Sequence, residues 1–271
     1  MAGEIRLVVE ETAKTGKVAF VTIAHEQKLN TLNPDLMREF VSIMARVASD
    51  DGFQAVVLTG AGSKAFVGGA DIGAMAAIDD AAAAEAFISL VHGCCHAVRS
   101  CPMPVVARIN GWTLGAGLEL AAACDLRLAA STARFGMPEV KVGIPSVVEA
   151  ALLPGLIGWG RTRRLLMLGE TISAAEAAGW GLIEKVVAPE NLDAAISDWL
   201  CHLGAAGRQA LRLQKALIRR WEDLPVAQAI AAGVPAFAAA WASDEPRRMM
   251  RQFVDRPRQQ PGTSGWQHRT E

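Results

Sequence analysis

Apolar and polar positions along the first part of the chain change from a strand-like to a helix-like pattern. Ile5–Glu10 and Val18–Ile23 are rich in residues that favour strands, and the turn Lys14–Lys17 lies between them. Two such runs joined by a short glycine-containing turn predict a β-hairpin. Asn33 can then cap a helix that opens at Pro34, where the missing N–H of proline costs nothing.

Helix and strand patterns alternate after this point. The first helix has an apolar face at helical spacing, formed by Met37, Phe40, Val41, Met44 and Val47. Ala55–Thr59 follows as a short apolar strand of the kind that is buried on both faces of an α/β sheet. The later segments with the same alternation are the helix Ala81–Arg99, the strand Val105–Ile109, the helix Ala116–Ala123, and the strands Leu126–Ala129 and Val186–Val187.

The second half of the chain changes character and predicts a helical region. Ser173 and Glu176 have the spacing of a capping box that starts a short helix. The sequence then reads as helical from Leu192 to about Phe253. We therefore predict an α/β core over residues 1–195, a helical oligomerisation region over 196–256 and a disordered tail over 257–271.

Composition narrows the classes of function. The chain has 271 residues, 51% of them hydrophobic, and a formal net charge of −1. This charge gives no electrostatic reason to expect nucleic acid or an anionic membrane as a partner. The 5 cysteines show no disulfide framework, and no basic segment followed by an apolar run opens the chain. We expect a cytoplasmic protein.

One uncharged stretch, Leu224–Ser243, is long enough to cross a bilayer. Pro225, Gly233 and Pro235 interrupt it, and many of its residues are alanines of modest hydrophobicity. The stretch therefore favours helices that pack within the protein or between subunits, and we expect no membrane span.

Two glutamates are the strongest candidates for chemistry. Glu119 lies among Leu118, Leu120 and alanines, so its helix is expected to be buried on most sides. A buried carboxylate needs a partner or a raised pKa. Glu139 follows Pro138 and could point into the same cleft. Small residues at two turns, Ala70 and Ala116, would let a ligand oxygen approach backbone N–H groups closely.

Two weaker motifs suggest other chemistry. Gly60–Ala65 follows a strand and fits a loose dinucleotide fingerprint, but Gly68 and Gly69 follow before any helix could open. His92 and His96 are one helical turn apart beside two cysteines, and this arrangement could ligate a metal. No second ligand pair lies at a familiar spacing, so packing explains these residues better and we expect no metal.

Three motifs in one order resemble the crotonase (enoyl-CoA hydratase/isomerase) superfamily. Ala65–Ile72 (AFVGGADI) resembles its first signature. Asn110–Ala121 (NGWTLGAGLELA), with Cys124–Arg127 (CDLR) after it, resembles the second, and Phe135–Glu139 (FGMPE) resembles the third. The likeness runs from about residue 5 to 256.

This resemblance implies a spiral of ββα turns followed by a helical trimerisation region, assembled as a trimer or a hexamer made of two trimers. It implies that the N–H groups of Ala70 and Ala116 form an oxyanion hole and that Glu119 and Glu139 are the catalytic carboxylates. The positions implied to bind the CoA substrate are Lys28, Leu29, Ala70, Asp71, Ile72, Gly73, Ala116, Phe237 and Arg256. Phe237 and Arg256 would reach the CoA site of a neighbouring subunit.

The implied activity is hydration of an enoyl-CoA thioester, with CoA as part of the substrate and no separate cofactor. The superfamily also contains isomerases and other acyl-CoA lyases, and it contains members that bind RNA or protein without catalysis. Two positions depart from the common hydratase pattern. Gly73 stands where lysine is frequent, and Val142–Glu149 replaces a glycine-rich stretch near the acyl group. These departures leave the acyl substrate open.

Overall fold

The computed structural model describes residues 3–255 and contains two sheets. The larger sheet has six strands in the order β1-β2-β3-β5-β7-β10. β1 is antiparallel to β2, and every other neighbouring pair in it is parallel. Its strands are β1 (Glu4–Thr12), β2 (Gly16–Ala24), β3 (Phe53–Gly60), β5 (Val105–Ile109), β7 (Leu126–Ala130) and β10 (Lys185–Val187).

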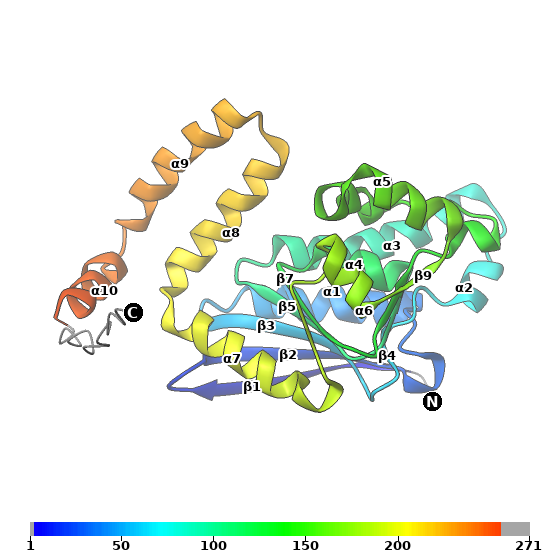
Figure 1. Cartoon of the computed structure of the whole chain (residues 1–271), viewed down its shortest axis with the longest axis horizontal. Helices are drawn as coiled ribbons and strands as arrows, with labels where there is room; N and C mark the ends of the chain where they lie inside the picture. Colours follow the sequence, from blue (N-terminus) through cyan, green and yellow to red (C-terminus); the bar gives the residue numbers. More distant parts are fainter. Residues whose placement is uncertain (1–2, 256–271) are drawn as a thin grey trace, which may run out of the picture.

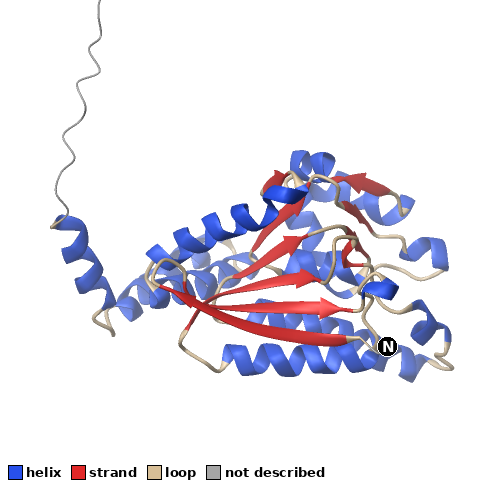
Figure 2. Cartoon of the chain, turned by 90° about the horizontal axis from the view of Figure 1, so that it is seen from below, coloured by secondary structure: helices blue, strands red, loops and turns tan. Residues whose placement is uncertain are grey.

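Helices cover both faces of this sheet (Figure 2). Successive residues of β3 point to opposite faces, so Val56 and Leu58 belong to one core while Ala55 and Val57 belong to another. The larger core lies against α1 (Pro34–Ala48), α3 (Ala81–Ser100) and α4 (Ala116–Ala123), and the smaller core lies under α7 (Leu192–Ala205). Burial on both faces explains why these strands are continuous apolar runs.

The second sheet was not predicted from the sequence. It has four strands in the order β4-β6-β8-β9, namely β4 (Ala65–Val67), β6 (Trp112–Leu114), β8 (Arg134–Gly136) and β9 (Thr171–Ser173). Each strand has 3 residues, which is too short for an alternating pattern to emerge. Each of the first three strands continues into one of the motif segments, so this small sheet brings the motifs together.

Side-chain caps fix the predicted helix starts. The Asn33 side chain accepts a hydrogen bond from the Leu36 N–H at 2.9 Å, as the sequence predicts. Ser173 likewise accepts from the Glu176 N–H at 3.1 Å and begins α6 (Ala174–Trp180). The carboxylate of Glu176 lies 3.1 Å from Arg164 Nη1 on the neighbouring α5 (Leu153–Leu168).

Helix α5 was not predicted from the sequence, and its glycines and Pro154 interrupt the helical pattern of apolar residues. Gly158 is in fact non-helical, with φ 77°, so that α5 is two helical pieces joined at a kink. The remaining short helical segments of the core are α2 (Ile72–Ala76) and the 3₁₀ turns Glu26–Lys28, Glu139–Val142, Val148–Leu152 and Pro189–Asn191.

The C-terminal helices form an arm that projects from the α/β body (Figure 1). It consists of α8 (Arg208–Asp223), α9 (Val226–Ala240) and α10 (Glu245–Val254). The buried Lys215 of α8 anchors the arm, with Nζ 2.6 Å from Asp125 Oδ2 and donating to the carbonyls of Val98 and Met103. α9 packs along α8 and leaves large apolar side chains exposed, including Val226, Ile230, Val234 and Phe237.

Within residues 3–255, two segments have the length and composition of a membrane span. One is α3, and the other is the pair α9–α10, which is bent by 85°. Helix α3 packs Phe87, Val91 and Val98 into the main core, and a core helix of this kind passes the same test. The expectation of no membrane span therefore stays a prediction.

The architecture confirms the predicted α/β core with a helical region after it. The hairpin, the apolar strands and the helices predicted from periodicity all occur, with ends shifted by a few residues. Arg256 and the predicted tail 257–271 lie outside the described residues.

Candidate active site

Glu119 is held inside the body of the protein by a helix that is buried along its whole length. Its side chain belongs to a residue that is only 4% exposed. Helix α4 can lie this deep because Gly117 carries no side chain, since a Cβ there would stand 2.0 Å from the Val67 carbonyl oxygen. The Ala150 N–H donates a hydrogen bond to Glu119 Oε1 at 3.3 Å. No other group within residues 3–255 forms a hydrogen bond with this carboxylate.

Glu139 reaches the same place from the end of the small sheet. It begins a 3₁₀ turn just after β8, and the Ser146 hydroxyl donates to its Oε2 at 2.8 Å. Its Oε1 lies against the backbone of Gly115, where an added Cβ would stand 2.5 Å away. The residue is half-buried.

The surroundings raise the proton affinity of both glutamates. Burial raises the pKa of Glu119 to about 8, and the nearby charge of Glu139 adds to this effect. Burial also raises the pKa of Glu139. The hydrogen bonds that its carboxylate accepts, including the one from Ser146, lower the pKa but by less than burial raises it. Near neutral pH the two carboxyl groups can therefore share one proton, and an acid and a base lie side by side.

Two backbone N–H groups, those of Ala70 and Ala116, belong to residues of the same cavity lining as the glutamates and have no acceptor in their own bridge or helix. Ala116 is the first residue of α4, where an N–H has no intrahelical acceptor, and the helix dipole adds positive potential. Ala70 forms a parallel bridge with Leu32. The bonds of that bridge run from Leu32 N–H to the Gly69 carbonyl and from Asp71 N–H to the Leu32 carbonyl, both at 2.9 Å. The Ala70 N–H is therefore outside the bridge and is left for a ligand.

Asn30 fixes the turn that carries Ala70. Its side chain donates to the carbonyls of Ala61 and Ala65 at 3.0 and 2.9 Å, and accepts from the His25 N–H at 2.9 Å. Asn30 is almost fully buried with φ 57°. The neighbouring Leu29 carbonyl accepts from the Gly68 N–H at 2.8 Å. These bonds explain how a loop far away in sequence holds the first motif.

Lys28 and Asp71 meet beside this turn. Lys28 Nζ lies 2.8 Å from Asp71 Oδ2, and Asp71 Oδ1 caps α2 by accepting from the Ala74 N–H. The ammonium of Lys28, with the cap as a second contribution, lowers the pKa of Asp71. Lys28 itself is exposed at the surface.

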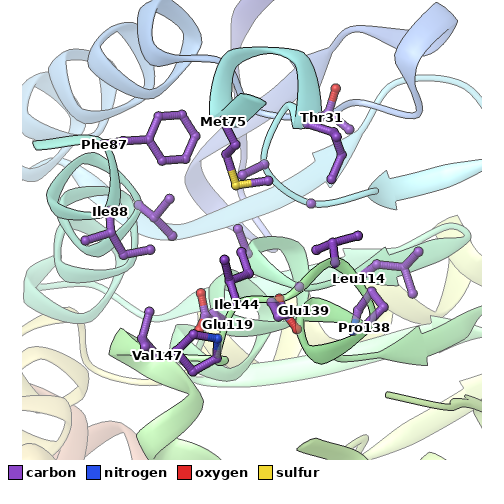
Figure 3. A pocket seen from close by; sticks show the side chains of 18 of the residues that line it. Thr31, Met75, Phe87, Ile88, Leu114, Glu119, Pro138, Glu139, Ile144 and Val147 are labelled. Atoms are coloured by element: carbon purple, nitrogen blue, oxygen red, sulfur yellow. The ribbon is translucent and has the colours of Figure 1, made fainter. Parts of the chain in front are cut away.

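A cavity of about 650 Å³ joins these groups. All three motif segments contribute to its lining, including Ala70, Ala116, Glu119 and Glu139. The rest of the wall is mostly apolar, with Phe87, Ile88 and Val91 from α3 and Ile144 and Val147 from the following loop. Figure 3 shows the two glutamates together on one side of this cavity, with Met75 and Phe87 across from them.

The structure thus brings together most of the residues that the sequence suggested. Ala70, Ile72, Ala116, Glu119 and Glu139 all line the cavity. Lys28, Leu29, Asp71 and Gly73 lie in the segments next to it. Phe237 lies on α9, in the arm that projects away from the body of its own chain (Figure 1).

The sequence reasoning missed Leu114, Gly115 and Ser146, and it gave His92 and Glu149 no shared role. Gly115 was part of a quoted motif, and its positive φ of 52° could have been suspected from the turn before α4. Ser146 and Glu149 lie in the stretch Val142–Glu149 that the sequence marked as a departure near the acyl group, but their partners Glu139 and His92 could not be predicted from it.

The two weaker motifs find no support. Gly60–Ala65 leads through a turn into strand β4 and not into a helix, so a pyrophosphate would meet no helix N-terminus there. His92 and His96 have ring centroids 5.8 Å apart, and no group of three or more metal-ligating side chains occurs in the part of the chain that the structure describes.

Comparison with known proteins agrees with this geometry. The family model described as enoyl-CoA hydratase/isomerase matches residues 13–261. The short-chain-enoyl-CoA hydratase of Clostridium acetobutylicum is 34% identical over 90% of this chain and 93% of its own length. The (E)-benzylidenesuccinyl-CoA hydratase of Thauera aromatica is 33% identical over 79% of this chain and 83% of its own.

Solved structures show the same architecture. The crystal structure of an enoyl-CoA hydratase from Bacillus anthracis superposes with a TM-score of 0.86 at 30% identity, covering 92% of this chain and 96% of that one. The fold is that of the crotonase superfamily. Within it, the chain belongs to the enoyl-CoA hydratase/isomerase family.

Proposed function

We propose that the protein is an enoyl-CoA hydratase that adds water across the 2,3 double bond of an acyl-CoA thioester. One observation carries the proposal: the buried carboxyl group of Glu119 and the half-buried one of Glu139 line one cavity together with Ala70 and Ala116, whose N–H groups have no acceptor in their own bridge or helix. Hydration needs an acid, a base and a site for the charge that develops on the thioester oxygen. The relatives described as hydratases support the same reaction.

The two N–H groups stabilise the transition state. When water attacks the β-carbon, negative charge moves to the thioester carbonyl oxygen and gives it enolate character. The N–H groups of Ala70 and Ala116 donate to that oxygen, and they are held in place before the reaction begins. Their contribution is largest in the transition state, where the charge on the oxygen is greatest.

The glutamate pair handles the protons. The ionised carboxylate takes a proton from the attacking water, and the protonated partner gives one to the α-carbon. The raised pKa of Glu119, about 8, favours the state in which the pair holds one proton near neutral pH. The apolar remainder of the cavity wall excludes other water from the acyl group.

The CoA part of the substrate supplies binding energy away from the reacting bond. We place it beside Lys28, Leu29 and the turn Ala70–Gly73, where the exposed Lys28 ammonium can approach a phosphate. CoA is then part of the substrate, and no separate cofactor is needed.

We propose further that the arm of α8–α10 builds a homotrimer, or a hexamer of two trimers. Val226, Ile230, Val234 and Phe237 are between 68% and 76% exposed in the single chain, and they recur along α9. Such a surface marks an interface. Phe237 would then reach a neighbour's CoA site.

Hydration of crotonyl-CoA, followed by loss of absorbance of the conjugated thioester, tests the function. We expect turnover by the wild-type protein and its loss in Glu139→Gln, with CoA binding largely retained. Absence of turnover with every enoyl-CoA tried would overturn the hydratase assignment. Conversion of a 3-enoyl-CoA to its 2-enoyl isomer without hydration would assign the protein to the isomerases.

A further inference from the structure

A hydrogen-bonded pair joins two elements that each carry cavity-lining residues or directly follow them in sequence. His92 Nδ1 of α3 lies 2.8 Å from Glu149 Oε1, which belongs to the 3₁₀ turn Val148–Leu152. Glu149 is 8% exposed, whereas the His92 side chain is 55% exposed. The pair therefore spans from the interior to the surface between α3 and this turn.

The pair comes just after the lining residues in sequence on both walls, but neither His92 nor Glu149 is itself a lining residue of the cavity. On α3 the lining residues furthest along the helix are Ile88 and Val91, and His92 lies one turn after Ile88 on the same side. On the opposite wall the lining ends at Val147, two residues before Glu149. In the close-up view Ile88 and Val147 lie beyond Glu119, on the side away from Glu139 and Pro138 (Figure 3).

A buried glutamate paired with a histidine is a costly way to hold two elements together, so a purely structural role does not explain the pair. Glu149 Oε2 is buried and has no hydrogen-bond partner within the described chain. Burying a carboxylate with only one of its oxygens bonded is costly, and an apolar side chain of similar size would fill the space more favourably. The backbone also turns sharply here, because the β-branched Val148 has φ 40°, a conformation that such residues rarely adopt. That turn points Val147 into the cavity while Glu149 turns towards His92.

We propose that the His92–Glu149 pair is the end wall of the acyl pocket and so limits the length of the acyl chain that the enzyme accepts. This inference rests on the proposed hydratase function and concerns the same cavity. A thioester bound with its oxygen at Ala70 and Ala116 extends its acyl chain past Glu119, along Ile88, Val91 and Val147. Chains that pass these residues meet the pair, which holds the two walls together.

The test compares crotonyl-CoA with trans-2-decenoyl-CoA in the wild-type protein, His92→Ala, Glu149→Ala and the double variant. Opening the wall should raise the ratio of kcat/KM for decenoyl-CoA to kcat/KM for crotonyl-CoA about tenfold or more, because two additional buried methylenes at about fourfold each give about sixteenfold. The double variant should change the ratio no more than the larger single change, since both substitutions open one contact. The ratio is the readout because the Ala150 N–H next to Glu149 also bonds Glu119, so absolute rates will fall in Glu149→Ala.

His96→Ala is the matched control. It removes the same side chain one turn further along α3, where the histidine makes no hydrogen bond or ion pair with Glu149 within the described residues. It should leave the ratio unchanged. Circular dichroism and thermal unfolding establish that each variant is folded. Because His92 is exposed and Glu149 is buried, His92→Ala should disturb the fold less than Glu149→Ala.

Binding of butyryl-CoA and decanoyl-CoA by calorimetry gives a second readout that needs no turnover. If the affinity for decanoyl-CoA relative to butyryl-CoA is higher in His92→Ala and Glu149→Ala than in the wild-type protein, the result supports the proposal that the pair forms the end wall. If folded His92→Ala and Glu149→Ala keep the wild-type chain-length profile in both assays, the inference is wrong, although an active wild-type enzyme still upholds the hydratase function. A wild-type protein that hydrates no enoyl-CoA rejects that function, and the binding profiles then decide on the end wall alone.

Discussion

Gly115 and Glu139 touch so closely that no side chain fits between them. A Cβ on Gly115 would stand 2.5 Å from Glu139 Oε1, and the φ of Gly115 is already positive, at 52°. The same residue precedes Ala116 and so sets the direction of that N–H. One glycine therefore positions both a carboxylate and an oxyanion donor.

We predict that Gly115→Ala lowers kcat for crotonyl-CoA hydration by about 10²-fold or more, because the added methyl displaces Glu139 by an amount that catalysis does not tolerate. Steady-state kinetics measure this effect. Gly158→Ala is the matched control, since Gly158 also has positive φ, 77°, but an added Cβ meets nothing within 4 Å. Equal loss of activity in both variants would show that backbone strain alone is responsible.

The two carboxyl groups should be needed together. Glu119→Gln and Glu139→Gln each remove one proton-transfer group and should each lower kcat by about 10²–10⁴-fold. Stopped-flow or steady-state assays with crotonyl-CoA will quantify both losses. A loss in only one of the two variants would favour the one-carboxylate chemistry of an isomerase over hydration.

Activity should depend on pH through the same pair. We expect kcat/KM to rise on the acid side as Glu139 loses its proton, since burial raises the pKa of Glu139 above its ordinary value of 4.5. It should fall on the alkaline side around pH 8, where Glu119 loses its proton. A pH–rate profile of Glu119→Gln should lack the alkaline limb in its residual activity.

The raised pKa of Glu119 also predicts how stability depends on pH. The folded protein keeps a proton on Glu119 up to about pH 8, whereas the unfolded chain releases it near its ordinary pKa of 4.5. The free energy of unfolding should therefore fall as pH rises through this window, by up to about 1.4 kcal/mol per pH unit. Urea unfolding at fixed protein concentration should show a flatter dependence for Glu119→Gln, and parallel curves would contradict the shift.

Ala116→Pro should remove one oxyanion donor. Proline lacks the N–H, and it is tolerated at the first position of a helix, so α4 can keep its structure. The loss corresponds to about 10²–10³-fold in kcat. Circular dichroism must show an intact fold, and full activity in a folded variant would rule out this donor.

Assembly should depend on the exposed face of α9. Val234 is 74% exposed in the single chain, and Val234→Asp places a charge in the proposed interface. We expect light scattering to show dissociation of the oligomer at micromolar concentration. Gln228→Asp adds the same charge to a polar position of the same helix and should leave assembly intact. A wild-type protein that is monomeric would contradict the proposal.

Periodicity and caps predicted the large elements because they are local properties. The apolar run Ala55–Thr59 and the face of the helix after Pro34 carry enough residues for a period to be visible. Asn33 and Ser173 marked helix starts through bonds to residues three positions on. The small sheet and α5 could not be found in this way, because three-residue strands have no period and glycines mask the kinked helix.

The glutamates were found because their motifs are specific, but the groups that hold them were not. Ser146 bonds Glu139 and Ala150 bonds Glu119 through geometry that only the folded chain creates. Asn30 joins the first motif to a loop more than 30 residues away in sequence, where no spacing rule applies. Local patterns therefore give the reacting groups, and tertiary contacts give their orientation.

The hydrogen bond from the Ala150 N–H to Glu119 has a practical consequence for redesign. The segment that bears Ala150 also carries Glu149, the residue proposed to close the far end of the acyl pocket, so a substitution that reshapes that end should shift the support of Glu119. Substrate scope and catalytic rate are then not independent variables in this scaffold. Directed evolution towards bulkier thioesters should require compensating changes around Glu119, and libraries that randomise both regions together should outperform those that treat the pocket alone.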